Sequence, residues 1–159
     1  MSSAAPDSLV RLVVFRFEQQ RYGLPLAAVE RVLPMVAVAA LPKAPAVALG
    51  VINVGGRLIA VVDLRRRLGL ARQEYGLTGH LLVTRTHRRT LILPVDAVLG
   101  VMAVTADAVT SPDHLLPRIG HLAGIVALPD GLLFIQDLDA VLSLDEEHEL
   151  ASALEEHAS

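Results

Sequence analysis

The stretch that decides the fold is Gly50–Leu70, which reads GVINVGGRLIAVVDLRRRLGL. Two runs rich in Val, Ile and Leu flank the pair Gly55-Gly56, and such runs are typical of β-strands. Two glycines between strands indicate a two-residue hairpin turn, because the primed turns of hairpins need positive φ angles. A phosphate-binding loop is disfavoured, since its glycines would lead into a helix rather than into a strand.

The stretch ends in three consecutive arginines, Arg65–Arg67, between Leu64 and Leu68. The two leucines share one face of a short helical turn, whereas the arginines point in different directions around it. The pattern predicts packed leucines and arginines that are solvated or form surface ion pairs. No aromatic residue that could stack on bases lies nearby, so no nucleic-acid partner is expected.

The stretch has a counterpart later in the chain. A shift of 74 residues places Gly50–Leu68 on Gly124–Leu142, and a shift of 69 residues places Leu12–Val32 on Leu81–Val101. Identical residues recur along both alignments: Leu12/Leu81, Val14/Val83, Arg16/Arg85, Leu24/Leu93, Pro25/Pro94, Ala28/Ala97, Val29/Val98, Val32/Val101, Gly50/Gly124, Leu58/Leu132, Asp63/Asp137, Leu64/Leu138 and Leu68/Leu142. Two ungapped blocks in the same order indicate a duplicated unit; the alternative is chance similarity in a chain rich in Val and Leu.

Each unit contains about five short strands and no long helix. A strand with alternating pattern is followed by a turn and a strand that ends in Leu-Pro, and a short helical turn is expected at Leu26–Val29 and at Val95–Val98. A further strand, a loop and a hairpin complete the unit. This order predicts a mainly β protein built from two small antiparallel barrels.

Asp63 and Asp137 follow equivalent strands in the two units. Paired carboxylates can act as acid and base, but their repeat relation favours a duplicated structural role. We expect each carboxylate to cap the helical turn that follows it.

The composition narrows the function further. At 159 residues with 53% hydrophobic residues, the chain is long enough for about one domain with a buried core. The absence of cysteine excludes disulfides and thiolate catalysis, and no catalytic constellation, metal site or cofactor motif emerges from the remaining residues. The N-terminus has neither the basic nor the apolar region of a secretory signal, so a cytoplasmic protein is expected.

One alternative stays open at this point. His114 and His121 lie in a long loop of the second unit, beside Asp113, and could converge on a metal ion. Their spacing does not require it. The alternative function is a small-ligand or metal-binding sensor that uses the groove between the barrels.

The C-terminal segment is acidic. Residues 143–159 contain six carboxylates and no Lys or Arg. Ser143 and Glu146 fit a capping box and predict a helix that runs to about Glu156. The expected organisation is therefore a disordered tail over residues 1–8, a domain over 9–144 and an acidic helix or tail over 145–159.

Four stretches resemble the CheW family of bacterial chemotaxis coupling proteins. They are LVVFRFEQQRYGLPLAAVERVL at 12–33, LPKAPAVALGVINVGGRLIAVVDLRRRLGL at 41–70, LPVDAVLGVMAV at 93–104 and HLAGIVALPDGLLFIQDLDAVL at 121–142. The resemblance covers residues 9–144. It implies two intertwined, SH3-like barrels of five strands with a hydrophobic core between them.

The resemblance also implies a function. Members of this family are non-enzymatic adaptors that join chemoreceptor tips to the regulatory domain of the histidine kinase CheA. They are peripheral to the membrane only through the receptors.

The resemblance implies contact residues as well. Gly50, Asn53 and Gly56 match the family's signature hairpin. On the partner-contacting segments, Val29 and Val32 match in the first unit, and Val98 and Val101 match in the second.

Two positions depart from the family pattern. The family usually reads Asn-Leu-Arg-Gly where this chain has Gly55 in place of the arginine, and Arg31 stands where a glutamate is common. Arg57 offers a guanidinium group nearby, although strand alternation directs it differently from the family arginine.

Overall fold

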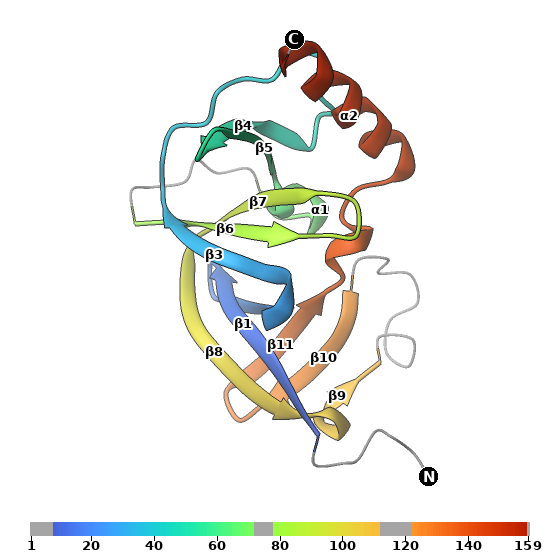
Figure 1. Cartoon of the computed structure of the whole chain (residues 1–159). Helices are drawn as coiled ribbons and strands as arrows, with labels where there is room; N and C mark the ends of the chain where they lie inside the picture. The colour runs from blue at the N-terminus through green and yellow to red at the C-terminus, as the bar shows by residue number, and fades with distance from the viewer. Residues whose placement is uncertain (1–7, 72–77, 112–121, 159) are drawn as a thin grey trace.

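The computed structural model describes residues 8–71, 78–111 and 122–158 and contains two β-sheets (Figure 1). The first sheet, called barrel 1, has the strand order β3-β6-β7-β5-β4, and the second, called barrel 2, has the order β8-β1-β2-β11-β10-β9. Barrel 1 comprises β3 (Val29–Pro34), β4 (Ala48–Val54), β5 (Arg57–Val62), β6 (His80–Arg85) and β7 (Thr90–Val95). Barrel 2 comprises β1 (Leu9–Phe17), β2 (Gln20–Pro25), β8 (Ala97–Thr105), β9 (Val109–Thr110), β10 (Leu122–Leu128) and β11 (Gly131–Gln136).

The two repeat units exchange their first two strands. The first unit contributes β3, β4 and β5 to barrel 1 but β1 and β2 to barrel 2, and the second unit does the converse with β6 and β7. Each barrel therefore contains residues from both halves of the chain.

The exchange adds one parallel pairing to each sheet, β5 with β7 and β2 with β11. The expectation of wholly antiparallel barrels is corrected at these two pairings, and barrel 2 has six strands because the two-residue β9 joins it.

The strand registers repeat with the offsets found in the sequence. Val61 lies opposite Ile92 in barrel 1, and the equivalent Ile135 lies opposite Gly23 in barrel 2. The β-bulges repeat too: Glu30 is the extra residue of β3 and Leu99 is the extra residue of β8. Matching register and matching bulges at equivalent positions support duplication over chance similarity.

Three hydrophobic clusters hold the molecule together. One lies within barrel 1 around Val61 and Val83, and another lies within barrel 2 around Val14 and Leu133. The largest cluster lies between the barrels and draws residues from both, as the resemblance implied: Val13, Phe15, Phe17, Tyr22, Leu24, Leu41, Val47, Val51, Ala60, Val62, Leu64, Leu82, Leu91, Leu93, Val95, Leu138, Val141, Leu142, Leu150 and Ala153. Burial of this apolar surface is the main force that fixes one barrel on the other.

Short helical turns follow the strands. They are η1 (Leu26–Ala28), α1 (Leu64–Arg67), η2 (Ala106–Ala108) and η4 (Leu138–Ala140). The expected side-chain cap is present before η4, where the Asp137 carboxylate accepts a hydrogen bond of 3.2 Å from the N–H of Asp139. Asp63 occupies the equivalent position before α1, but its side chain makes no capping bond.

The burial of Arg65 contradicts the expectation that Arg65–Arg67 are all solvated or form surface ion pairs. Its side chain is 1% exposed and forms two hydrogen bonds, of 2.9 and 2.8 Å, to the carboxylate of Asp96. Its guanidinium carbon also lies 5.1 Å from the centre of the Phe17 ring. The sequence pattern missed this burial because Asp96 and Phe17 reach α1 only through the exchange of strands.

The buried pair connects barrel 1 to barrel 2. Asp96 also accepts a 2.7 Å hydrogen bond from the N–H of Glu18, in the β1–β2 turn. In the other half, Asp139 stands at the position equivalent to Arg65 and accepts a 2.7 Å hydrogen bond from the N–H of His87, in the β6–β7 turn. The β1–β2 turn is thus joined to α1 through Asp96, which bonds to both Glu18 and Arg65. The β6–β7 turn is joined to η4 directly, through the carboxylate of Asp139.

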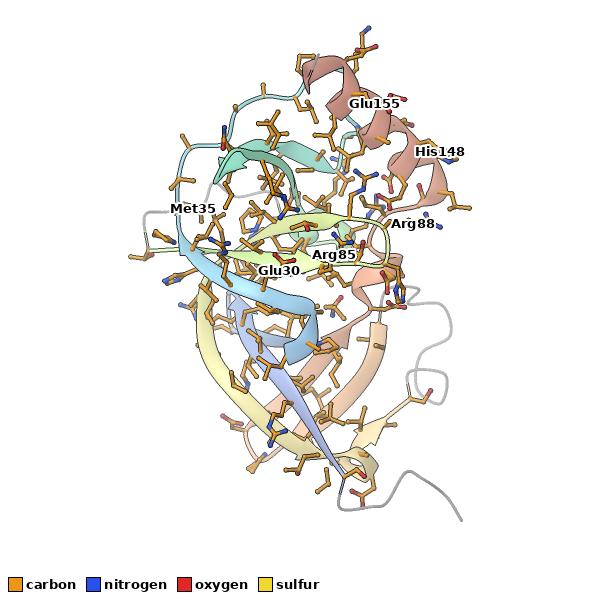
Figure 2. The ribbon with its side chains drawn as sticks, in the orientation of Figure 1. Glu30, Met35, Arg85, Arg88, His148 and Glu155 are labelled. Atoms are coloured by element: carbon orange, nitrogen blue, oxygen red, sulfur yellow. The ribbon has the colours of Figure 1, made fainter. Side chains whose placement is uncertain are left out.

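The C-terminal helix α2 (Leu144–Ala158) lies beside barrel 1, at the end of the molecule away from barrel 2 (Figure 1). The predicted capping box is present, since Glu146 accepts from the N–H of Ser143 at 2.9 Å and donates its own N–H to the Ser143 hydroxyl at 3.2 Å. Leu150 and Ala153 pack on the central cluster. His148 and Glu155 mark the exposed side of the helix (Figure 2).

Ion pairs fasten α2 to barrel 1. Glu146 pairs with Arg67 of α1, and Glu147, 9% exposed, pairs with Arg89 at 2.7 Å and with Arg88 at 3.9 Å. Among the described helices, α2 included, none is long and apolar enough to cross a membrane.

We expect the docking of α2 to weaken at acid pH. Burial raises the pKa of Glu146, but hydrogen bonds from Ser143 and the charge of Arg67 outweigh it and hold the pKa below its ordinary value. Glu146 therefore stabilises the fold above its ordinary pKa of 4.5, and this contribution is lost as the pH falls through the lower pKa of the folded state.

The measurement is the free energy of unfolding in denaturant at pH 6.5 and at pH 4. The fall in stability should be smaller in Glu146→Gln than in the unchanged chain. Glu149→Gln removes an exposed carboxylate of the same helix and is the matched control. An identical pH dependence in all three proteins would contradict the role of Glu146.

Candidate partner-binding surface

The two barrels present equivalent edge strands, β3 and β8. Each is the first strand of its sheet and pairs on one side only, β3 with β6 and β8 with β1. An edge strand has unpaired backbone N–H and C=O groups, and other proteins can bind to them. The predicted contact residues Val29, Arg31 and Val32 lie on β3, and Val98 and Val101 lie on β8.

The valines of these strands fall into two kinds. Val29 and Val98 are half-buried and pack against the central cluster, so they shape the junction of the barrels. Val32 and Val101 are 42% and 61% exposed, which makes them the residues that a partner can cover. The structure therefore separates four residues that the resemblance had grouped together.

Further apolar residues are exposed at repeat-related positions. Leu58 of β5 and Leu132 of β11 are 38% and 47% exposed, and Leu99, the bulge residue of β8, is 50% exposed. Sequence reasoning did not select these leucines. The available signal was that Leu58 and Leu132 are identical in the repeat alignment, which suggests an equivalent role for them in the two barrels.

The β4–β5 hairpin has the predicted primed turn. Gly55 and Gly56 have φ angles of +58° and +90°, and the side-chain oxygen of Asn53 accepts a 2.8 Å hydrogen bond from the N–H of Gly56. All three residues are exposed at the tip of the hairpin. The positive φ of Gly55 is one that glycine adopts more readily than the arginine found in the family pattern.

Gly50 lies beneath the surface rather than on it. It is buried, with a φ of +151°, and a Cβ atom built on it would lie 2.1 Å from the backbone oxygen of Ala39. Its role is to let residue 39 bond to Val51 as an isolated bridge. Gly50 supports the hairpin and is corrected from a contact residue to a structural one.

Arg57 is exposed at the start of β5. Its guanidinium group donates a 3.2 Å hydrogen bond to the hydroxyl of Thr90, which also receives a 3.4 Å bond from Arg85. Arg57 thus lies on the face of the sheet that encloses the interior of barrel 1, beside another arginine that sequence reasoning did not select.

The alternative of a ligand site between the barrels finds no support in the described residues. The central hydrophobic cluster occupies the interior of the junction. A cavity of about 330 Å³ lies at its edge, lined by Leu91, Leu138 and Leu142 among others, and the described residues bring no group of three possible metal ligands together. His114, His121 and Asp113 lie outside the described residues, as does the predicted tail except Ser8.

These features define a class of protein: a double β-barrel, built by duplication, that exposes an equivalent edge strand on each barrel. A family model described as "CheW-like domain" matches residues 11–146. The match spans most of the chain, and the chain belongs to the CheW-like family.

Known proteins agree with this assignment. The chain is 30% identical over 137 residues to "Chemotaxis protein CheW" of Rhizobium meliloti (strain 1021), which covers 85% of this chain and 88% of the relative. It is 29% identical over 139 residues to "Chemotaxis protein CheW" of Thermotoga maritima, with 86% and 91% covered.

A solved structure shares the fold. The scaffolding protein TtCheW from Thermoanaerobacter tengcongensis superimposes with a TM-score of 0.79 at 24% sequence identity, over 87% of this chain and 96% of that chain. The predicted function class is confirmed: the chain is a non-enzymatic chemotaxis coupling adaptor.

Proposed function

We propose that this chain joins the tip of a chemoreceptor to the regulatory domain of a CheA-type histidine kinase. The observation that carries the proposal is the pair of exposed edge strands, one on each barrel, with Val32 and Val101 at equivalent places on them. Two binding edges on one rigid core are what a coupling protein needs, because the two partners are then held at a fixed distance and angle.

The two partners differ in what they can use. A receptor tip is a helical coiled coil, whose backbone groups are already paired. It would therefore bind through the exposed apolar side chains of the β8 edge, such as Val101, rather than through the backbone groups of that strand. A folded domain with a strand edge of its own can bind along β3. Since the receptor tip and the kinase regulatory domain both lie in the cytoplasm, the chain would act there and reach the membrane only through the receptor.

The proposal is tested by titrating the purified chain with the kinase regulatory domain of its own organism in a calorimeter. The unchanged chain should bind, and Val32→Asp should weaken binding at least about tenfold, because a carboxylate would be buried against the partner without a counter-charge. Leu144→Asp, which places the same charge at a residue 59% exposed on α2, is the matched control and should bind normally.

Two results would contradict the proposal. The first is no binding of either the kinase domain or a receptor-tip fragment by the unchanged chain. The second is equal loss of affinity in Val32→Asp and Leu144→Asp, which would mean that added charge, rather than the β3 edge, determines binding.

A further inference from the structure

Three exposed arginines lie at one end of barrel 1. They are Arg31 on β3, Arg57 on β5 and Arg85 on β6. Within the described ranges, no carboxylate oxygen lies within 4.0 Å of any of the three guanidinium groups. This distinguishes them from Arg65, Arg67 and Arg89, which are all ion-paired.

Two of the guanidinium groups are held side by side. Arg57 and Arg85 donate to the same oxygen, the hydroxyl of Thr90, at 3.2 and 3.4 Å. Thr90 is 8% exposed, so the shared oxygen forms a nearly buried floor beneath two exposed charges. One hydroxyl uses a small part of their hydrogen-bonding capacity, since each guanidinium has five N–H donors. Two like charges held together without an anion repel each other, and a carboxylate placed across them would relieve that repulsion.

Arg31 extends the cluster to the edge of the sheet. It lies opposite Val83 in the register of β3 and β6, and Arg85 follows two residues later on the same face of β6. Glu30, the bulge residue that precedes Arg31 in the sequence, is acidic and exposed (Figure 2). It forms no ion pair with these arginines in the described structure, so the cluster keeps a net positive charge.

The equivalent place in barrel 2 serves as an internal comparison. Arg16 and Arg21 stand at the positions of Arg85 and Thr90, while Gly131 replaces Arg57 and Gly100 replaces Arg31. There Arg21 pairs with Asp130 at 2.6 Å, and Arg16 donates to the backbone oxygen of Glu18 at 3.0 Å. The hydrogen bond from Arg21 lowers the pKa of Asp130 below its ordinary value. In barrel 2 one of the two arginines is thus neutralised by a carboxylate, whereas none of the three arginines in barrel 1 has a carboxylate partner among the described residues.

We infer that Arg31, Arg57 and Arg85 bind a segment of the kinase regulatory domain that carries at least two carboxylates, and that this contact selects the cognate kinase. The inference rests on the proposed function, because it adds charge recognition to the β3 edge. Planar guanidinium groups suit carboxylates, which accept two parallel hydrogen bonds. The kinase is the occupant because the cluster adjoins the edge strand that only a partner with its own strand can extend.

The test compares two double variants that lose the same charge. Arg57→Ala/Arg85→Ala removes the two guanidinium groups that share the Thr90 hydroxyl. Arg11→Ala/Arg66→Ala removes two exposed arginines on β1 and α1. Titration with the kinase regulatory domain at about 50 and 300 mM salt should show a loss of about a hundredfold in affinity for the first variant at low salt, about tenfold for each arginine. The control should stay within about threefold of the unchanged chain. The first variant should also lose most of the salt dependence.

Thermal melting of each variant checks the fold, and exposed side chains predict little change. Equal affinities in the two double variants would overturn the inference while leaving the proposed function intact. Loss of affinity for a receptor-tip fragment, with kinase binding unchanged, would assign the cluster to the receptor and overturn the choice of partner. Absence of kinase and receptor binding by the unchanged chain would overturn the proposed function and the inference together.

Discussion

Replacement of Arg65 by methionine should lower the free energy of unfolding by about 3 kcal/mol, although the variant keeps a long side chain at this position. Arg65 is 1% exposed, and its loss leaves the Asp96 carboxylate, itself 23% exposed, without its counter-charge between the two barrels. The contact with the Phe17 ring is lost as well. In a chain of this size the change corresponds to a fall in Tm of about 10 °C, measured by calorimetry.

The reciprocal change should cost more. Asp96→Ala leaves a guanidinium charge in a nearly dry site, where it cannot be neutralised at ordinary pH, and we expect a loss of about 4 kcal/mol. Arg66→Met is the matched control, since Arg66 is exposed on the same turn and should change stability by no more than about 0.5 kcal/mol. Similar stability in Arg65→Met and Arg66→Met would show that the buried pair does not hold the barrels together.

Gly50→Ala should be the most damaging of the small substitutions, with a loss of more than about 3 kcal/mol or failure to fold. The added Cβ would lie 2.1 Å from the backbone oxygen of Ala39, and the φ of +151° strains any L side chain. The clash is with backbone, so it cannot be relieved by a rotamer change. It would break the hydrogen bonds of 2.8 and 2.9 Å that join residue 39 to Val51.

Two other glycines provide graded controls in the same denaturation experiment. Gly124 is the repeat counterpart of Gly50, but its added Cβ would meet the side chain of Val109 at 2.6 Å, which can shift, and a loss of about 1–2 kcal/mol is expected. A Cβ added at Gly55 would meet no atom beyond its chain neighbours within 4 Å, but the φ of +58° disfavours an L side chain, so alanine there should cost about 1 kcal/mol. Gly50→Ala and Gly55→Ala of equal stability would contradict the close-approach argument.

Local patterns accounted for most elements. The hairpin at Gly55-Gly56, the helical turns after Asp63 and Asp137 and the capping box of Ser143 and Glu146 are all present where they were expected. Turn and cap chemistry acts over a few residues, so these features can be recognised without knowledge of the fold.

One local expectation failed. The helical turn expected at Leu26–Val29 is present as η1, but residues 95–98 pass directly into β8. The position of Ala27 is taken in the second unit by Asp96, whose N–H bonds to the backbone oxygen of Arg16 and whose carboxylate holds Arg65 and Glu18. Contacts between distant segments override the local preference at this position.

The surface residues divide in the same way. Val32 and Val101 were identified through the repeat and the family resemblance, and both are exposed on edge strands. The burial of Gly50, the exposure of Leu99 in its bulge and the meeting of Arg57 with Arg85 over Thr90 depend on strand pairing. Alternation along one strand does not specify the strand beside it.

The offsets of 69 and 74 residues are properties of the sequence, and together with the strand patterns they already indicated a duplicated β protein with equivalent hairpins. The pattern could not specify that the units exchange strands. The exchanged strands carry the same residues at equivalent places, such as Leu12 and Leu81, so either strand would fit either barrel. The pairings of β2 with β11 and of β7 with β5 settle that choice by enclosing one shared core. Burial of Arg65 follows from the same pairings, since they bring Asp96 and Phe17 to a helical turn that the sequence alone places on the surface.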